Sequence, residues 1–283
     1  MNPTTTGITL VILSAVIWGM GGLFTRLLPF DLWTIVFWRG VFAVGFIGAY
    51  AWFRFGSTLP ALIRDAGIPG YATALSLAAT IVLFPAAFQY TSIANAFMIM
   101  AAMPFIAAFI AWIWRGERPS TLTMIASAVA LLGVSIMVGP TTGTARIGDA
   151  LALLGTATQA LALVIVRANP NVKMLPMIWL SVILTVVVSW PLAAAIGALT
   201  PRDYLVAAGF ALGPMTLGMI FFVAGSAMIP SALAALITVS EGPFGAIWAW
   251  IGLGEVPPLT TVIGGAIVLA AVVTRLLIEK NEI

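Results

Sequence analysis

Residues 103–119 read MPFIAAFIAWIWRGERP, and residues 241–257 read EGPFGAIWAWIGLGEVP. Both stretches carry a Pro-Phe pair near the start of an apolar run and a Gly-Glu-x-Pro turn at its end. Because glycine and proline end helices, each stretch predicts part of an apolar helix and the turn that follows it. The chain therefore contains two related segments that lie 138 residues apart.

Further matches extend this repeat beyond the quoted stretches. Trp38 and Trp179 stand 141 residues apart, and the same spacing separates Arg26-Leu27-Leu28-Pro29 from Arg167-Ala168-Asn169-Pro170. Within the stretches, Ala111-Trp112 also matches Ala249-Trp250. A single match could arise by chance, but five matches in the same order indicate a duplicated unit. The sequence therefore predicts a first repeat over residues 1–140 and a second repeat over residues 147–283.

The composition places both repeats in a membrane. Apolar residues make up 62% of the 283 residues, charged residues make up 7%, and the mean hydropathy is +1.14. A typical soluble domain carries about 25% charged residues. Here 12 basic and 9 acidic residues cannot give a 29.7 kDa chain the polar surface of a soluble globule. The strands of a membrane β-barrel would alternate apolar and polar residues, and these apolar runs do not alternate.

Apolar segments of the length that crosses a bilayer recur along the whole chain. A helix needs about 20 residues to cross about 30 Å of hydrocarbon. Segments of this kind cover residues 7–25, 31–53, 70–89, 94–114, 121–139, 148–167, 174–197, 204–225, 230–252 and 259–278. A unit of five crossings is odd, so its second copy enters the membrane in the opposite direction. The predicted fold class is an all-α membrane protein with ten transmembrane helices in two inverted five-helix repeats.

The basic residues predict the orientation of these spans. With a cytoplasmic N-terminus, the inner side holds Arg54, Arg64, Arg115, Arg118, Arg167, Lys173, Arg275 and Lys280, and the outer side holds Arg26, Arg146 and Arg202. Cytoplasmic loops carry an excess of lysine and arginine. The distribution therefore predicts that both termini are cytoplasmic. It also explains the formal charge of +3 without a nucleic-acid partner.

Several residue types that carry chemistry are missing. The chain has no Cys and no His, which excludes thiolate and histidine metal sites, Cys nucleophiles and Ser-His triads. The phosphate-binding motif of ATPases, GxxxxGK followed by Ser or Thr, does not occur in the sequence, so no ATPase is expected. Glu117 and Glu255, the acids of the two Gly-Glu-x-Pro turns, fall on opposite membrane faces and cannot act on one bond. We expect no enzyme activity, no cofactor and no metal.

The motifs resemble those of a known group of membrane proteins. Trp18-Gly19, Trp38-Arg39, and the Pro-Phe and Gly-Glu-x-Pro elements of each half are similar to those of the drug/metabolite transporter superfamily, EamA type. The resemblance implies a central cavity lined by spans 1–4 and 6–9, with spans 5 and 10 at the periphery. It also implies cargo of varied chemistry, amino acids among them, and favours efflux. Span 7 departs from span 2, because Leu180 stands where span 2 has Arg39.

Glu241 is the first candidate for a mechanistic role. It lies about 16 Å of helix from the outer end of its span, where an isolated charge costs on the order of 2.5–3.5 kcal/mol. Burial of a carboxyl group favours its protonated form, so the position suits a proton-coupling residue that also binds substrate. Pro243 follows closely and predicts a kink, because proline lacks an N–H and crowds the carbonyl four residues back. The competing interpretation is a structural acid paired with Arg39 or with hydroxyl groups.

Arg39 is the second candidate, about 12 Å into span 2 from the outer end. An arginine stays charged, so it must face a cavity, a carboxylate or the interface. Three interpretations compete. Arg39 forms a salt bridge with Glu241, anchors a substrate carboxylate, or extends its side chain to the outer surface.

Four further residues are candidate substrate contacts, each with a structural alternative. Trp18, in a glycine-rich part of span 1, is an aromatic cavity wall or a packing element. Gln159, in the middle of span 6, contacts substrate or bonds to a neighbouring helix. Asn95 is an outer-gate contact or a helix cap. Phe84, beside Pro85, faces the cavity or packs against core and lipid.

These features predict a secondary active transporter of a bacterial inner membrane. We expect it to export a small organic metabolite such as an amino acid, by alternating access around a midplane cavity, with protons as the coupling ion. The alternatives are an uncoupled exchanger or facilitator of the same fold, and a membrane scaffold without transport. A lipid-modifying enzyme would need a polar cluster at one interface. The glycine-rich span 10 could support a homodimer.

Overall fold

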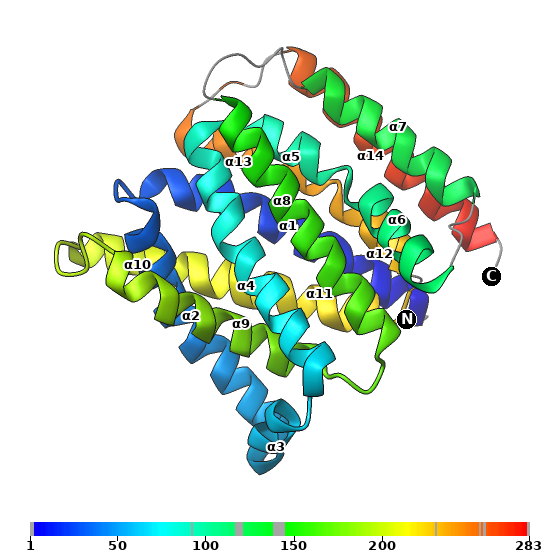
Figure 1. The fold of residues 1–283 in the computed structure, drawn as a ribbon. Helices are drawn as coiled ribbons and strands as arrows, with labels where there is room; N and C mark the ends of the chain where they lie inside the picture. Colours follow the sequence, from blue (N-terminus) through cyan, green and yellow to red (C-terminus); the bar gives the residue numbers. More distant parts are fainter. Residues whose placement is uncertain are drawn as a thin grey trace.

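The computed structural model describes residues 3–91, 93–116, 121–137, 145–229, 231–254, 256 and 259–281, and these residues form a bundle of helices (Figure 1). No strand occurs among them. In this part of the chain, seven helices are long and apolar enough to cross a membrane. They cover Thr4–Leu27, Leu32–Arg64, Gly67–Tyr90, Arg146–Ala168, Met174–Leu192, Pro201–Ser226 and Leu236–Leu253. The prediction of an all-helical, multi-pass membrane protein is therefore confirmed, whereas the ten-span inverted repeat stays a prediction.

The helices of the first half run from α1 to α7. They are α1 (Pro3–Leu27), α2 (Leu32–Phe55), α3 (Leu59–Arg64), α4 (Gly67–Tyr90), α5 (Ile93–Met100), α6 (Met103–Arg115) and α7 (Thr121–Met137), with a short 3₁₀ turn at Gly56–Thr58. The second half holds α8 (Ala145–Ala168), α9 (Met174–Ser189), α10 (Pro201–Phe210), α11 (Gly218–Ser226), α12 (Ser231–Thr238), α13 (Glu241–Leu253) and α14 (Leu259–Asn281). A 3₁₀ turn, η2 (Trp190–Leu192), follows α9, and η3 (Ala211–Leu217) separates α10 from α11.

Capping residues explain where several helices begin and end. Asp31 accepts hydrogen bonds from the backbone N–H groups of Trp33 and Thr34 at the start of α2, both at 3.0 Å. Gly116 and Gly254 end α6 and α13 in the left-handed conformation, each with φ of 69°. Glycine adopts this conformation without a steric penalty from a Cβ atom, which is why helices commonly end on it. Glu117 and Glu255, which follow these glycines, lie outside the described residues.

Two of the predicted spans are interrupted near their middle. The first is divided between α5 and α6 at Ala101-Ala102, and the second between α12 and α13 at Val239-Ser240. Each second helix carries a proline in its first turn, Pro104 or Pro243, where the missing N–H removes no intrahelical bond. The predicted kink at Pro243 is therefore a full interruption, and Glu241 is the first residue of a new helix rather than a mid-helix position.

A π-helical segment, η3, joins α10 to α11 and was not predicted. It contains Gly213-Pro214, and the hydroxyl of Thr216 donates to the carbonyl of Ala211, five residues back, at 2.7 Å. Proline crowds the backbone of the preceding turn, and the wider π-helix accommodates it. Segments of this type occur frequently at functional sites.

The span predicted over residues 174–197 was too long. The α-helix ends at Ser189, and the 3₁₀ turn that follows contains Pro191. Pro191 has no N–H group with which to continue the α-helical hydrogen bonds, which is consistent with the change to a 3₁₀ turn. The segment beyond the turn packs on the start of α2, where the Trp38 indole donates to the carbonyl of Ile196 at 3.1 Å.

The two halves pack against each other in a reciprocal pattern. Helix α1 of the first half contacts α11 and α13, while α8 of the second half contacts α4 and α6. Helix α2 pairs with α9, and α7 pairs with α14 along one edge of the bundle (Figure 1). Small residues allow these close approaches: a Cβ on Gly133 of α7 would lie 2.8 Å from the carbonyl oxygen of Gly264 of α14.

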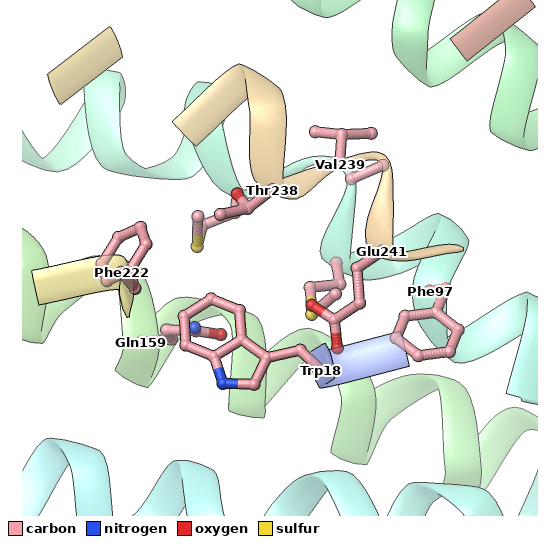
Figure 2. A pocket seen from close by; sticks show the side chains of 10 residues that line it. Trp18, Phe97, Gln159, Phe222, Thr238, Val239 and Glu241 are labelled. Carbon is pink, nitrogen blue, oxygen red and sulfur yellow. The ribbon is translucent and has the colours of Figure 1, made fainter. Parts of the chain in front are cut away.

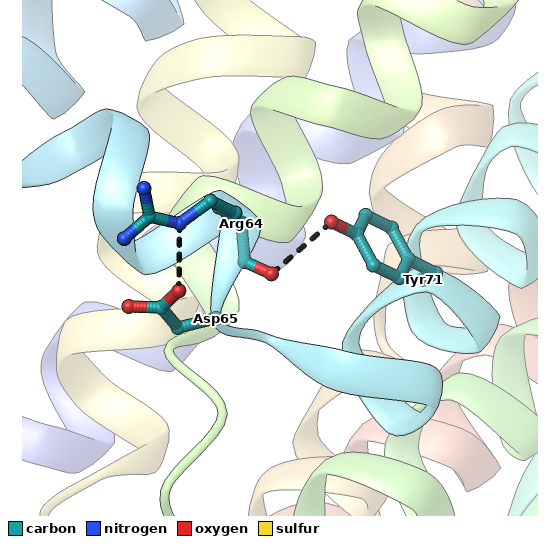
Figure 3. Close-up of polar contacts among 3 residues, drawn as sticks. All are labelled: Arg64, Asp65 and Tyr71. Carbon is teal, nitrogen blue, oxygen red and sulfur yellow. Dashed lines mark hydrogen bonds and ion pairs between the residues drawn. The ribbon is translucent and has the colours of Figure 1, made fainter.

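A polar contact group closes the turn between α3 and α4. Arg64 donates from Nε to the Asp65 carboxylate at 3.0 Å, and the Tyr71 hydroxyl donates to the carbonyl of Arg64 at 3.3 Å (Figure 3). The Arg64 and Asp65 side chains are 79% and 63% exposed. Exposed pairs of this kind add little stability, so this turn offers matched charged controls for the buried site described below.

We expect Gly19→Ala to lower the thermal stability of the detergent-purified protein. A Cβ at Gly19 would lie 2.9 Å from the backbone nitrogen of Gly245, so α1 and α13 would have to separate. Overpacking of this kind costs about 1–3 kcal/mol, which corresponds to a fall of at least about 2 °C in Tm.

The matched control for this substitution is Gly45→Ala in α2. Nothing lies within 4 Å of a Cβ at Gly45, and alanine favours helix more than glycine does. Its Tm should therefore not fall. Equal Tm values for the two variants would contradict the close contact between α1 and α13.

Candidate functional site

A cavity lies at the centre of the bundle, with about 190 Å³ open to the centres of water molecules. Helices α1, α2, α4, α5, α8, α9, α10, α11 and α13, together with η3, contribute to its walls, and α7 and α14 do not. These contributing elements correspond to predicted spans 1–4 and 6–9. The walls comprise Trp18, Gly21, Gly22, Thr25, Arg39, Ile47, Thr80, Ile81, Phe84, Pro85, Phe88, Phe97, Met100, Gln159, Ile178, Val182, Phe210, Pro214, Met215, Met219 and Glu241.

Five of the six residues proposed from the sequence as substrate contacts line this one cavity. They are Trp18, Arg39, Phe84, Gln159 and Glu241, and they come from five different helices. The sixth, Asn95, lies in α5, and its side chain falls outside the described part of the structure. The role of all six in substrate binding stays a prediction.

Arg39 is held at one side of the cavity by contacts with α4 and α10. Its side chain is only 5% exposed, its Nη2 donates a hydrogen bond to the backbone carbonyl of Ile81, and its guanidinium lies over the Phe210 ring, 4.9 Å from the ring centroid. The Nε–H group is buried and has no hydrogen-bond acceptor among the described residues. A buried, charged donor without an acceptor suits a negatively charged ligand group.

The arrangement around Arg39 argues against two of the three interpretations given above. No ion pair joins Arg39 to Glu241 in the part of the chain that the structure describes, so the expected salt bridge is absent from this conformation. The side chain does not extend to the outer surface either, because it is buried against Ile81 and Phe210. The Nε–H group, which is unpaired among the described residues, is compatible with the third interpretation, an anchor for a substrate carboxylate.

Glu241 and Gln159 share a second, smaller cavity that adjoins the first. Figure 2 shows the Glu241 carboxyl group between the side chains of Trp18 and Phe97. The side-chain oxygen of Gln159 is buried and accepts no hydrogen bond from the described residues. Glutamine amides in membrane helices normally bond to a partner helix. The oxygen of Gln159 therefore makes no such interhelical bond among the described residues.

The glycine-rich stretch around Trp18 serves two purposes. Gly19 packs closely on α13, whereas Gly21 and Gly22 line the large cavity. The Trp18 indole rests against Phe222, with ring centroids 5.1 Å apart, and Gly218 leaves room for it, since a Cβ there would lie 2.6 Å from the indole.

Phe84 belongs to a row of aromatic rings along the cavity. Its ring centroid lies 6.5 Å from that of Phe88, which in turn lies 5.9 Å from that of Phe97. Pro85 does not end α4, which continues from Gly67 to Tyr90. The cavity-facing interpretation of Phe84 thus has geometric support.

Comparisons with known proteins agree with this architecture. Residues 5–139 match the EamA-like transporter family. The first half of the chain is thus EamA-like. An uncharacterized transporter of Archaeoglobus fulgidus is 25% identical to this EamA-like transporter over 274 residues, covering 93% of each chain. A protein of known crystal structure superimposes with a TM-score of 0.75 at 13% identity, covering 98% of each chain, which shows a shared fold alone.

The family match of the first half and the transporter relative together indicate the general activity. This EamA-like protein is a multi-pass membrane transporter and not an enzyme. Such a transporter binds small-molecule substrates and resides in the lipid bilayer. Among the described residues of the transporter, no group of three His, Cys, Asp or Glu side chains could hold a metal ion.

Several cavity residues of this EamA-like transporter escaped the sequence analysis. Phe210 contacts Arg39, Phe97 and Phe222 flank the smaller cavity, and Pro214 belongs to η3. A phenylalanine in an apolar helix has the same sequence signature whether it faces lipid, core or cavity. Gly213-Pro214 was the one signal available, because that pair predicts a local irregularity in a span.

Proposed function

We propose that this protein is a proton-coupled secondary transporter that exports a small organic metabolite, such as an amino acid, from a bacterial cell. The observation that carries the proposal is the cavity with one buried cation, Arg39, and one carboxyl group, Glu241, on walls contributed by both halves of the chain. Polar groups at membrane depth are expensive and normally serve transport or pairing. Here no ion pair links the two groups.

The reciprocal packing of the halves supports alternating access. In an inverted repeat, each contact of a helix in one half recurs for its counterpart in the other half, as do the contacts of α1 with α11 and α13 and those of α8 with α4 and α6. The α6 and α13 helices also have the same length of 13 residues and end on glycines with equal φ. We propose ten spans in two inverted units, 1–140 and 147–283, that rock around the cavity.

The coupling proposal rests on Glu241. Interrupted helices in transporters place ion sites at mid-membrane, and Glu241 stands at such an interruption, facing a cavity. A carboxyl group in this position can take up and release a proton as the cavity changes its access to water. The direction of transport and the inner-membrane location are proposed from the family resemblance. The distribution of basic residues supports the proposal that both termini are cytoplasmic.

Two other functions remain to be separated from this one. An uncoupled exchanger or facilitator would use the same cavity without a proton at Glu241. A membrane scaffold would have no use for a cavity that contains a buried Arg39 without a carboxylate partner.

Flux measurements on the purified protein test the proposal. The protein is first screened by thermal shift against zwitterions, acids and amines, and the best binder is then followed in proteoliposomes with and without a pH gradient. One pH unit stores about 1.4 kcal/mol per proton, which supports about tenfold accumulation. Saturable, gradient-driven accumulation is expected. Equal flux with and without the gradient would indicate the uncoupled facilitator, and the absence of any saturable flux would indicate the scaffold.

A further inference from the structure

The smaller cavity is a fraction of the size of the large one. It offers about 30 Å³ to the centres of water molecules, against about 190 Å³ in the large cavity. The small space suits one chemical group of a solute, and the large one suits the rest of the molecule. Trp18, Phe97, Met100, Gln159 and Glu241 line both cavities, so the small one is a side chamber of the large one.

The walls of this side chamber have an unusual chemical composition. Three aromatic residues, Trp18, Phe97 and Phe222, contribute to it, as Figure 2 shows. Two of its polar groups can accept hydrogen bonds, namely the carboxyl group of Glu241 and the amide oxygen of Gln159. No lysine or arginine is among its lining residues in the described part of the chain.

Each of these features favours a positively charged donor. Aromatic faces attract cations through their quadrupoles, and this attraction increases when water is excluded. A carboxylate pairs with a cationic donor in a short, strong hydrogen bond. The buried Gln159 oxygen lacks the donor that a buried acceptor needs.

We propose that the side chamber binds the primary ammonium group of the transported solute. This inference rests on the proposed transport function and names the part of the solute that the chamber recognises. A primary ammonium group is about the size of one water and brings three N–H donors, which suits two side-chain acceptors in a confined space. A quaternary ammonium group carries no N–H, so it cannot donate to the Glu241 carboxyl group or to the unpaired Gln159 oxygen.

The position of the chamber also sets the orientation of the solute. With the ammonium group at Glu241 and Gln159, the remainder of the solute occupies the large cavity, where Arg39 presents an unpaired Nε–H. The apolar walls between them, Phe84 and Met100 among others, suit an apolar body. The chamber thus selects for an unsubstituted amine, and the large cavity admits variation in the rest of the molecule.

Simple salts provide the test, because they require no knowledge of the natural solute. Methylammonium chloride, tetramethylammonium chloride and sodium chloride are titrated at constant ionic strength into the purified protein, and Tm and heat of binding are recorded. Methylammonium alone is expected to bind saturably. Glu241→Gln should weaken its apparent affinity by at least about tenfold, because a buried charge partner is lost. Asp65→Asn, which removes an exposed carboxylate on the α3–α4 turn, should leave it unchanged.

Other outcomes would overturn the inference. Equal binding of tetramethylammonium would contradict the requirement for N–H donors, and preferential binding of sodium would indicate an inorganic cation site. Methylammonium binding that survives in Glu241→Gln would place the ligand elsewhere. Solute flux without methylammonium binding would defeat the ammonium site alone, whereas methylammonium binding without any solute flux would defeat the transport function and leave the site standing.

Discussion

Glu241→Gln is expected to abolish the dependence of solute accumulation on the pH gradient. Glutamine preserves the size of the side chain and its ability to hydrogen-bond, but it cannot bind and release a proton. Gradient-driven accumulation in proteoliposomes should therefore fall by about tenfold under one pH unit, which is the whole contribution of one coupled proton. Exchange of labelled for unlabelled solute at saturating concentration should continue, because exchange consumes no gradient.

Two controls make this result specific. Asp65→Asn changes a carboxylate that is 63% exposed, far from the cavity lining, and should retain gradient-driven accumulation. A Glu241→Asp variant keeps a titratable group with a shorter side chain and should retain coupling at a reduced rate. Full gradient-driven accumulation by Glu241→Gln would show that the coupling ion binds elsewhere or is not a proton.

Arg39→Met is expected to stabilise the protein while it abolishes transport of carboxylate-bearing solutes. The guanidinium is 5% exposed, its Nε has no acceptor, and no carboxylate pairs with it among the described residues. A charge near the middle of a membrane helix costs on the order of 2.5–3.5 kcal/mol on insertion scales. An apolar side chain of similar length removes this cost and keeps the contact with Phe210, so Tm should rise.

The same substitution removes the proposed anchor for a carboxylate. Loss of a charged partner from a buried ion pair costs about 2–5 kcal/mol, so the apparent affinity for acidic solutes should fall by at least about 30-fold. Arg64→Met, at a side chain that is 79% exposed, is the matched control and should change neither Tm nor affinity. A lower Tm together with unchanged transport would assign Arg39 a purely structural role.

The sequence was sufficient for the membrane class and for most helix positions, because apolar runs bounded by proline and glycine have few other interpretations. The sequence was insufficient to predict how each proline changes its span, because a proline in a helix can have several structural effects. Pro85 stays inside a continuous α4, Pro214 lies in a π-helix, and Pro191 ends α9 early. Each outcome depends on the neighbouring helix that compensates for the lost hydrogen bond, and that neighbour is not encoded locally.

The candidate site shows the same division. Arg39, Gln159 and Glu241 could be selected from the sequence because polar groups are conspicuous in an apolar helix. Their partners could not be predicted. The acceptor of Arg39 is the backbone carbonyl of Ile81, which any residue supplies, and the expected partner Glu241 lines the same large cavity without an ion pair to Arg39 in the described part of the chain. Pairing distances depend on the rotation and depth of each helix, and hydropathy determines neither.

The two halves of the chain differ at the very positions that face the cavity. Leu180 stands in the second half where the first has Arg39, and Met103 begins α6 where Glu241 begins α13. If the halves exchange shapes during transport, a perfectly duplicated chain would have equal energies when open to either side. Because each charge is present in only one of the two halves, the two states would then differ in free energy. The empty carrier would mostly occupy the state of lower free energy. Arg39 and Glu241 would then determine how often the empty carrier is open to the side from which it binds its substrate.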